Sequence, residues 1–149
     1  MTLKDTIQHD LHDAMRARDQ VRSGTLRMAL TAIQTAQVAG TTAHELDDDE
    51  VLRVLAKEAK KRKESAAAYA DAGRPELAER ENAELAILEG YLPAQLSDDE
   101  LAAIAAQAIA DVGATGMQQM GQVMKAAQQS VAGRADGGRV AAAVKKALA

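Results

Sequence analysis

Residues 47–92 read DDDEVLRVLAKEAKKRKESAAAYADAGRPELAERENAELAILEGYL, and this segment predicts two helices folded into an antiparallel hairpin. Asp47 is followed three residues later by Glu50, which is a variant of the capping box that begins a helix. Gly73 suits the position just after a helix ends, and Pro75 suits the first turn of the next helix. Because the joint between them is short, the two helices should lie side by side.

Apolar residues recur at helical spacing on both sides of this hairpin. We expect two helices before it, over about residues 3–18 and 20–38, and three shorter helices after it. Pro93 cannot continue a helix, so we place a boundary there. The predicted organisation is an N-terminal helical domain of residues 1–92 and a three-helix tail of residues 93–149.

The composition of the 149 residues also favours helices. The chain holds 34 alanines, which are the strongest helix formers, and has no Phe, Trp or Cys. The predicted fold is therefore all-α: a four-helix N-terminal subdomain that contains the hairpin, followed by a small three-helix C-terminal subdomain. The lack of Cys excludes disulfides and thiolate catalysis and fits a cytoplasmic location. No signal peptide and no apolar run of membrane-spanning length is expected.

The net charge of −4 is not typical of a nucleic-acid-binding protein. The negative balance lies in residues 1–92, whereas residues 93–149 are neutral. Any contact with RNA must therefore use local groups of basic side chains.

One such group lies in the first hairpin helix, where four basic residues share an outward face suited to phosphate contacts. Glu58 and Glu64 interleave with it, so an ordinary solvated helix face is the alternative interpretation. The four residues are Arg53, Lys57, Lys60 and Lys61.

A second group lies in the tail, where Lys125, Arg134 and Arg139 are candidate RNA contacts. Arg134 follows Gly133 in a turn from which it could reach a phosphate. Gly133 and Asp136 also fit a helix stop and an N-cap.

Arg62 falls on the buried face of the first hairpin helix, and Glu81 and Glu84 fall on the buried face of the second. A buried charge without a partner costs several kcal/mol, so we predict that Arg62 pairs with one of these carboxylates. Arg22 lies on an inward face in the same way. The ion pair could fix the register of the helices, or the polar groups could line a groove that reads a ligand.

Other chemistry is weakly supported. His9, His12 and Asp13 share a helix face, but that face lies opposite the apolar stripe and has too few ligands for a metal site. Gly116 and Gly121 have the spacing of a phosphate loop without its Lys and Ser/Thr. We expect no cofactor, no metal and no self-contained catalytic site.

Five ordered segments together resemble the GatB/YqeY family, over essentially the whole chain. They are Val21-Arg22-x3-Leu26-Arg27-Met28, Lys57-Glu58-x-Lys60-Lys61-Arg62-Lys63-Glu64-Ser65, Glu89-x-Tyr91-Leu92-Pro93-x-Gln95-Leu96-Ser97, Met120-Gly121-x2-Met124-Lys125 and Gly133-Arg134-Ala135-Asp136-Gly137.

The resemblance implies a helical domain followed by a small three-helix domain. The same module forms the tail of the B subunit of the glutamine-dependent tRNA amidotransferase, where it is thought to engage tRNA. By this resemblance Gly121, Met124, Gly133 and Gly137 are packing or turn positions, and Lys125 and Arg134 are RNA contacts. The family-level activity is that of a carbon–nitrogen ligase with glutamine as amide donor. This chain lacks the ATP-binding and amidase parts, so we do not expect that activity from it alone.

The sequence therefore favours a non-catalytic module for tRNA or another structured RNA. The alternative is an adaptor that docks on an amidotransferase or another translation protein. In that case Met117, Met120 and Met124 could form a plastic apolar contact, although core packing is the commoner use of such a stripe.

Overall fold

The structure is a computed structural model that describes all residues from 1 to 149. It confirms the all-α class, because seven α-helices and one short 3₁₀ helix make up its regular structure and no strand is present. The chain forms two compact units, Met1–Leu92 and Pro93–Ala149, which are described separately below. None of the helices combines the length and the apolar character needed to cross a membrane.

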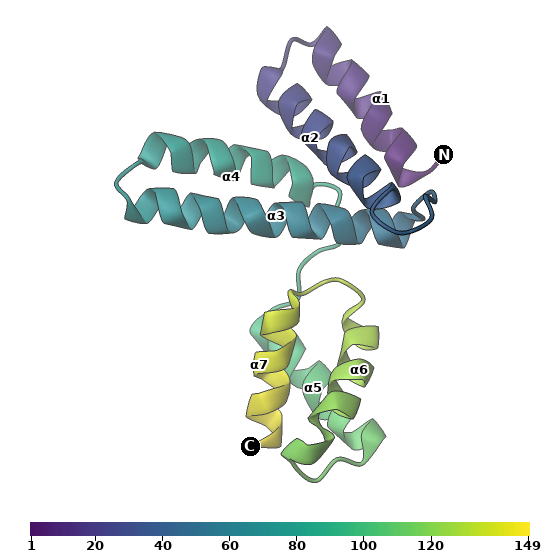
Figure 1. Cartoon of the computed structure of the whole chain (residues 1–149). Helices are drawn as coiled ribbons and strands as arrows, with labels where there is room; N and C mark the ends of the chain where they lie inside the picture. Colours follow the sequence, from purple (N-terminus) through teal and green to yellow (C-terminus); the bar gives the residue numbers. More distant parts are fainter. The chain divides into compact units, whose positions relative to one another are not determined.

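The first unit contains α1 (Leu3–Arg16), α2 (Gln20–Gln37), α3 (Asp48–Asp71) and α4 (Pro75–Glu89). In Figure 1, α1 lies beside α2, and α3 and α4 form the long hairpin. Asp47 and Glu50 make both hydrogen bonds of the capping box at the start of α3. Gly73 has a φ of +73°, a left-handed conformation that glycine adopts without strain and that lets the chain turn into α4.

The core of the first unit is aliphatic and gathers residues from all four helices. From α3 it includes only positions in the first half of the helix. Farther along the hairpin, Ala66 and Ala78 are buried outside this cluster. The fully buried apolar side chains of the distal half of the hairpin are therefore small, and larger ones such as Tyr69 and Leu77 are only partly buried. The buried core residues are Ile7, Ala14, Leu26, Ala29, Ile33, Val51, Leu55, Ala59, Leu85 and Leu88.

The second unit contains α5 (Asp98–Val112), the 3₁₀ helix η1 (Met117–Gln119), α6 (Met120–Val131) and α7 (Gly137–Leu148). The Ser97 hydroxyl accepts a hydrogen bond from the backbone N–H of Glu100 and so caps α5. Its core draws on all three α-helices and on the segment before α5. The buried core residues are Leu96, Leu101, Ala105, Ala108, Val123, Ala127, Val131, Val140 and Val144.

The methionine stripe predicted for the tail does not form its core. Met117 is 49% exposed because it lies in η1, before the regular helix begins. Met120 and Met124 are half-buried beside the core, and Val123 belongs to the buried stripe of α6. Met124 is thus a packing residue at the edge of the cluster.

The glycines of the tail motifs differ in what they do. Gly133 has a φ of +79° and ends the turn after α6, where a side chain would be strained. At Gly121 an added Cβ would meet no atom within 4 Å, so no close helix contact requires glycine there. At Gly137 an added Cβ would make only an ordinary contact with the Gln128 side chain.

Candidate functional site

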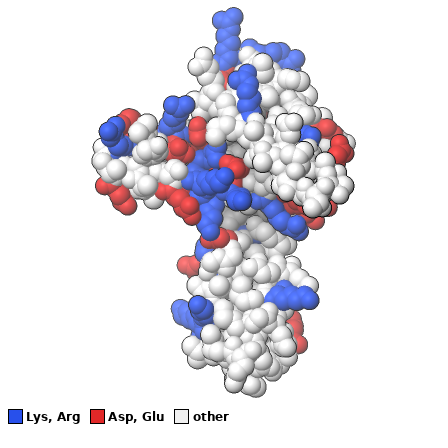
Figure 2. Space-filling model, viewed as in Figure 1, with Lys and Arg blue, Asp and Glu red and all other residues white.

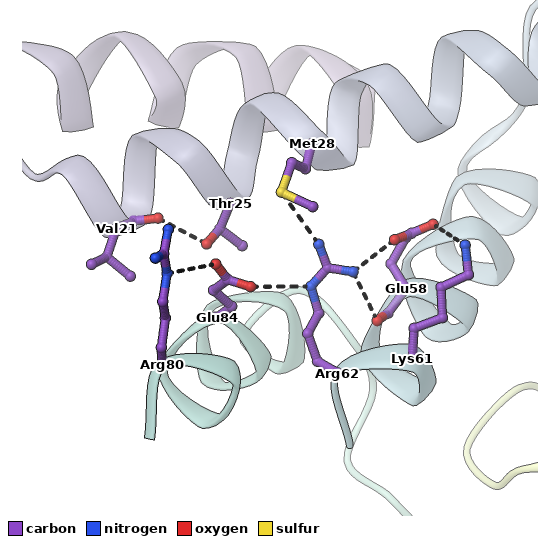
Figure 3. A network of polar contacts seen from close by, with 8 residues as sticks. All are labelled: Val21, Thr25, Met28, Glu58, Lys61, Arg62, Arg80 and Glu84. Atoms are coloured by element: carbon purple, nitrogen blue, oxygen red, sulfur yellow. Dashed lines mark hydrogen bonds and ion pairs between the residues drawn. The ribbon is translucent and has the colours of Figure 1, made fainter. Parts of the chain in front are cut away.

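Arg62 lies where α3 meets α2 and α4, and it is only 5% exposed. Its Nη1 donates to the Glu58 carboxylate at 2.7 Å and to the Glu58 backbone carbonyl at 3.2 Å. Its Nη2 lies 3.6 Å from the Met28 sulfur. Its Nε is 3.7 Å from a Glu84 carboxylate oxygen and has no hydrogen-bond partner. Figure 3 shows the guanidinium held between these three side chains.

Arg62 pairs with one of the two carboxylates named in the sequence prediction, Glu84, and also with Glu58, which that prediction did not include. Glu84 is near, but Glu81 makes no ion pair with Arg62, and the shortest contact is with Glu58. Residues four apart are neighbours on a helix surface. Glu58 therefore reaches Arg62 within α3 itself, and no other helix is needed to bring the two side chains together. This spacing is visible in the sequence, where Glu58 also interleaves with the basic residues of α3.

Two further cations extend this network toward solvent. Lys61 lies 3.2 Å from the Glu58 carboxylate, and Arg80 lies 3.9 Å from that of Glu84. Three cations thus surround two carboxylates. The Arg62 side chain is 6% exposed and both carboxylate side chains are about 15% exposed, so the two pairs of Arg62 lie mostly out of water and are only weakly screened. The network ties α3 to α4 and places Arg62 against α2.

A second polar cluster links α1 to the end of the α4 segment. The Tyr91 hydroxyl donates to the Asp10 carboxylate at 2.5 Å, and Arg22 lies 3.9 Å from the same carboxylate. Burial, and then the hydrogen bond to Asp10, raises the pKa of Tyr91 well above its ordinary value of 10.0. The Arg22 side chain is 42% exposed, so it lies at the edge of α2 and not on an inward face.

The Tyr91 hydrogen bond predicts a dependence of stability on alkaline pH. The folded state holds the phenol proton more tightly than the unfolded state, so this contribution is complete below pH 10.0 and is lost as the pH rises above it. Tyr91→Phe should lower the free energy of unfolding by about 1–2 kcal/mol at neutral pH. It should also flatten the decline above pH 10.0. Urea unfolding of both proteins from pH 7 to pH 11 measures this, and equal slopes would contradict it.

The two clusters bring together three of the segments that carry the family resemblance. Residues 21–28 contact residues 57–65 through Met28 and Arg62. Residues 21–28 and residues 89–97 meet at Asp10, through Arg22 and Tyr91. Segments far apart in the sequence therefore converge on the same unit.

The His9, Asp10 and Asp13 side chains place their ligand atoms within 4.8 Å of one another. Asp13 already accepts a hydrogen bond from Arg16, which is the main cause of its lowered pKa. Asp10 is bonded to Tyr91. His12 is exposed and does not join the group. Because both carboxylates are committed to other residues, this group gives no specific support to a metal site.

The outward face of α3 is basic in the structure. Arg53, Lys57 and Lys60 are exposed, and Lys61 is 58% exposed beside Glu58. Figure 2 shows Lys and Arg side chains gathered over the middle of α3. We call these four residues the α3 basic face.

The three basic candidates in the tail have different environments. Arg134 donates to the backbone carbonyls of Ser130 and Val131, at the end of α6. Arg139 donates to the Leu96 carbonyl at 2.9 Å and to the Asp98 carboxylate at 2.8 Å. Lys125 is exposed on α6. Both arginines therefore hold the tail together through their guanidinium groups.

Comparison with known proteins identifies the family. The model of the Yqey-like protein family matches residues 4–148. The chain is 34% identical over 88 residues to "Altered inheritance of mitochondria protein 41, mitochondrial" of Meyerozyma guilliermondii. The aligned region covers 59% of this chain and 45% of that protein. It is 33% identical over 96 residues to an uncharacterized protein of Schizosaccharomyces pombe, which covers 64% of this chain and 76% of that one.

A protein of Kluyveromyces lactis with the same mitochondrial name is 34% identical over 85 residues, or 57% of this chain and 45% of that protein. The aligned part thus spans less than half the length of the two proteins with this name. The word mitochondrial in that name does not support the expected cytoplasmic location. Because the family model covers nearly every residue, the chain belongs to the YqeY-like protein family.

Proposed function

We propose that this chain is a non-catalytic RNA-binding module, directed to tRNA or another structured RNA, that receives phosphates on the α3 basic face. The observation that carries the proposal is the α3 basic face itself, four cations on one side of one helix in an otherwise acidic unit. Phosphate contacts supply most of the affinity of proteins for nucleic acids, and such contacts need no deep pocket.

The geometry of α3 suits this role. At a rise of about 1.5 Å per residue, Arg53 and Lys61 are about 12 Å apart along the helix, so several phosphates of one strand can be reached together. The buried Arg62 network fixes the rotation of α3 and so keeps its opposite face toward solvent. The Arg62 ion pairs thus help to hold the α3 basic face toward solvent.

The tail has a smaller part in this proposal. The Arg134 and Arg139 guanidinium groups are hydrogen-bonded within the tail, so Lys125 is the most open of the three candidate contacts there. The resemblance to the amidotransferase B-subunit tail supports tRNA as the RNA class. The ligase activity of that enzyme is not proposed for this chain alone.

The test is a titration of tRNA at several salt concentrations with two matched variants. Lys57→Gln/Lys60→Gln should weaken binding about tenfold at low salt, equivalent to under 1 kcal/mol per charge. It should also reduce the slope of log K against log salt by about 2. Lys145→Gln/Lys146→Gln removes the same charge from the exposed end of α7 and should leave the slope nearly unchanged. Fluorescence anisotropy with labelled tRNA measures both.

Two results would remove this proposal. One is the absence of saturable binding at 50 mM salt or below. The other is an equal loss of affinity in both double variants, because that would indicate a response to net charge and not to the α3 basic face.

A second candidate is an adaptor that docks on an amidotransferase or another translation protein. It is favoured by Val21 and Met28, two half-exposed apolar side chains seven residues apart on α2. Residues at this spacing lie on the same side of a helix and suit contact with a partner. A pull-down with and without nuclease separates the candidates, since partners bridged by RNA disappear after nuclease treatment.

A further inference from the structure

The guanidinium of Arg62 has more donors than good acceptors. Arginine carries five N–H donors and cannot lose its charge in proteins. Nη1 is satisfied by two oxygens of Glu58, but Nε has no hydrogen-bond partner. The contact of Nη2 is the Met28 sulfur, and a thioether is a weak acceptor. A buried cation therefore has an edge that is only weakly bonded.

The Met28 side chain covers this edge from α2, as Figure 3 shows. Met28 is 49% exposed, so an oxidant in solution can reach it. Methionine sulfoxide differs from methionine in carrying an oxygen that is a strong hydrogen-bond acceptor, and cells can reduce it again. The residue that oxidants can reach is thus the residue whose oxidised form would give Nη2 a strong acceptor in place of a weak one.

We propose that Met28 is a reversible oxidation site and that its sulfoxide accepts a hydrogen bond from Nη2 of Arg62. With hydrogen peroxide, a sulfur lone pair attacks one peroxide oxygen, an S–O bond forms and the O–O bond breaks. The hydroxide that leaves takes up the proton of the new S–OH group, which gives water and the neutral sulfoxide. The sulfur is oxidised by two electrons and the peroxide is reduced by two. Arg62 keeps its charge throughout.

The charges around Arg62 favour a neutral acceptor at this place. Glu58 and Glu84 already lie beside the guanidinium, so an added anion would be repelled by both. A sulfoxide brings no net charge. Because Met28 is half-exposed, its oxidation places little polar surface in the core, which is the usual reason that methionine oxidation disrupts proteins. Oxidation should therefore tighten the contact of α2 with α3.

Two substitutions at Met28 test this without any oxidant. Met28→Gln supplies a neutral amide oxygen at a similar distance along the side chain, and Met28→Leu supplies none. We expect the melting temperature of the Gln variant to exceed that of the Leu variant by about 4–8 °C, the shift that one ordinary hydrogen bond gives in a domain of this size. In an Arg62→Met background the difference should disappear. A Gln variant no more stable than the Leu variant overturns the proposal.

Direct oxidation gives an independent test that does not require an Arg62 variant to fold. The unsubstituted chain and Met28→Leu are treated alike with hydrogen peroxide, and mass spectrometry confirms the sulfoxide at each position. Met15 and Met117, which are 47% and 49% exposed, serve as matched positions that are oxidised in both proteins. Treatment should lower the melting temperature less in the unsubstituted chain than in Met28→Leu. A greater loss in the unsubstituted chain overturns the proposal.

Discussion

Replacement of Arg62 with alanine is expected to lower the free energy of unfolding by about 2–4 kcal/mol. The change removes the guanidinium and leaves Glu58 and Glu84, whose side chains are only 14% and 15% exposed, without the cation that they share. Each kcal/mol corresponds to roughly 4–8 °C of melting temperature in a domain of this size. Thermal unfolding followed by circular dichroism measures the effect.

Arg80→Ala is the matched control, because Arg80 pairs with the same Glu84 while its own side chain is 75% exposed. Exposed pairs contribute little, so this variant should lose less than about 1 kcal/mol. If Arg62→Ala keeps near-native stability and loses RNA binding, the network reads a ligand and does not fix the helices.

Ile33→Ala should lower the free energy of unfolding by about 2–5 kcal/mol, the usual result of truncating a large core side chain. Ile33 lies on α2, has no exposed surface and packs in the core of the first unit. Chemical denaturation at neutral pH measures the change through the shift of the midpoint at constant slope.

Met28→Ala provides the comparison from the same helix. Met28 is 49% exposed, so its truncation removes little buried apolar surface and should lower the stability by less than about 1 kcal/mol. Equal losses at the two positions would mean that α2 is rotated relative to the arrangement described above.

Local chemistry allowed much of the fold to be predicted from the sequence. The cap at Asp47 and the left-handed glycine at Gly73 each depend on a few neighbouring residues. Such signals act over one turn of the chain and can be read without knowing what packs where. For this reason the predicted helices agree with the observed ones to within about two residues at most ends.

Contacts between distant residues were harder to predict. The hydrogen bond of Tyr91 to Asp10 joins residues 81 positions apart, and no local pattern indicates it. Met28 likewise meets Arg62 across 34 positions. A helical wheel shows which face is buried but not which side chain of another helix lies opposite. The sequence therefore predicted a buried arginine, Arg62, paired with Glu84, but not the contacts of Arg62 with Glu58 and Met28.

The tail contains contacts of another kind that the sequence does not indicate. Arg134 and Arg139 each follow a glycine, a pattern that suggests cations free to meet a ligand. Instead, their guanidinium groups bond the carbonyls of Ser130, Val131 and Leu96. The ends of helices and the turns between them leave carbonyl groups without backbone partners, and a nearby arginine can donate hydrogen bonds to these groups. The sequence alone does not show which carbonyl groups lack a backbone partner.

The distal half of the α3–α4 hairpin, where Ala66 and Ala78 replace the larger side chains of the core, has a consequence for motion. Little apolar surface resists separation there, so amide hydrogens near Gly73 should exchange with solvent faster than those near Leu55. Within one continuous pair of helices, the end near Gly73 should thus open more readily than the end that packs in the core of the first unit. A molecule that binds the end of the hairpin near Gly73 would meet a segment that can change its conformation while the core of the first unit stays folded.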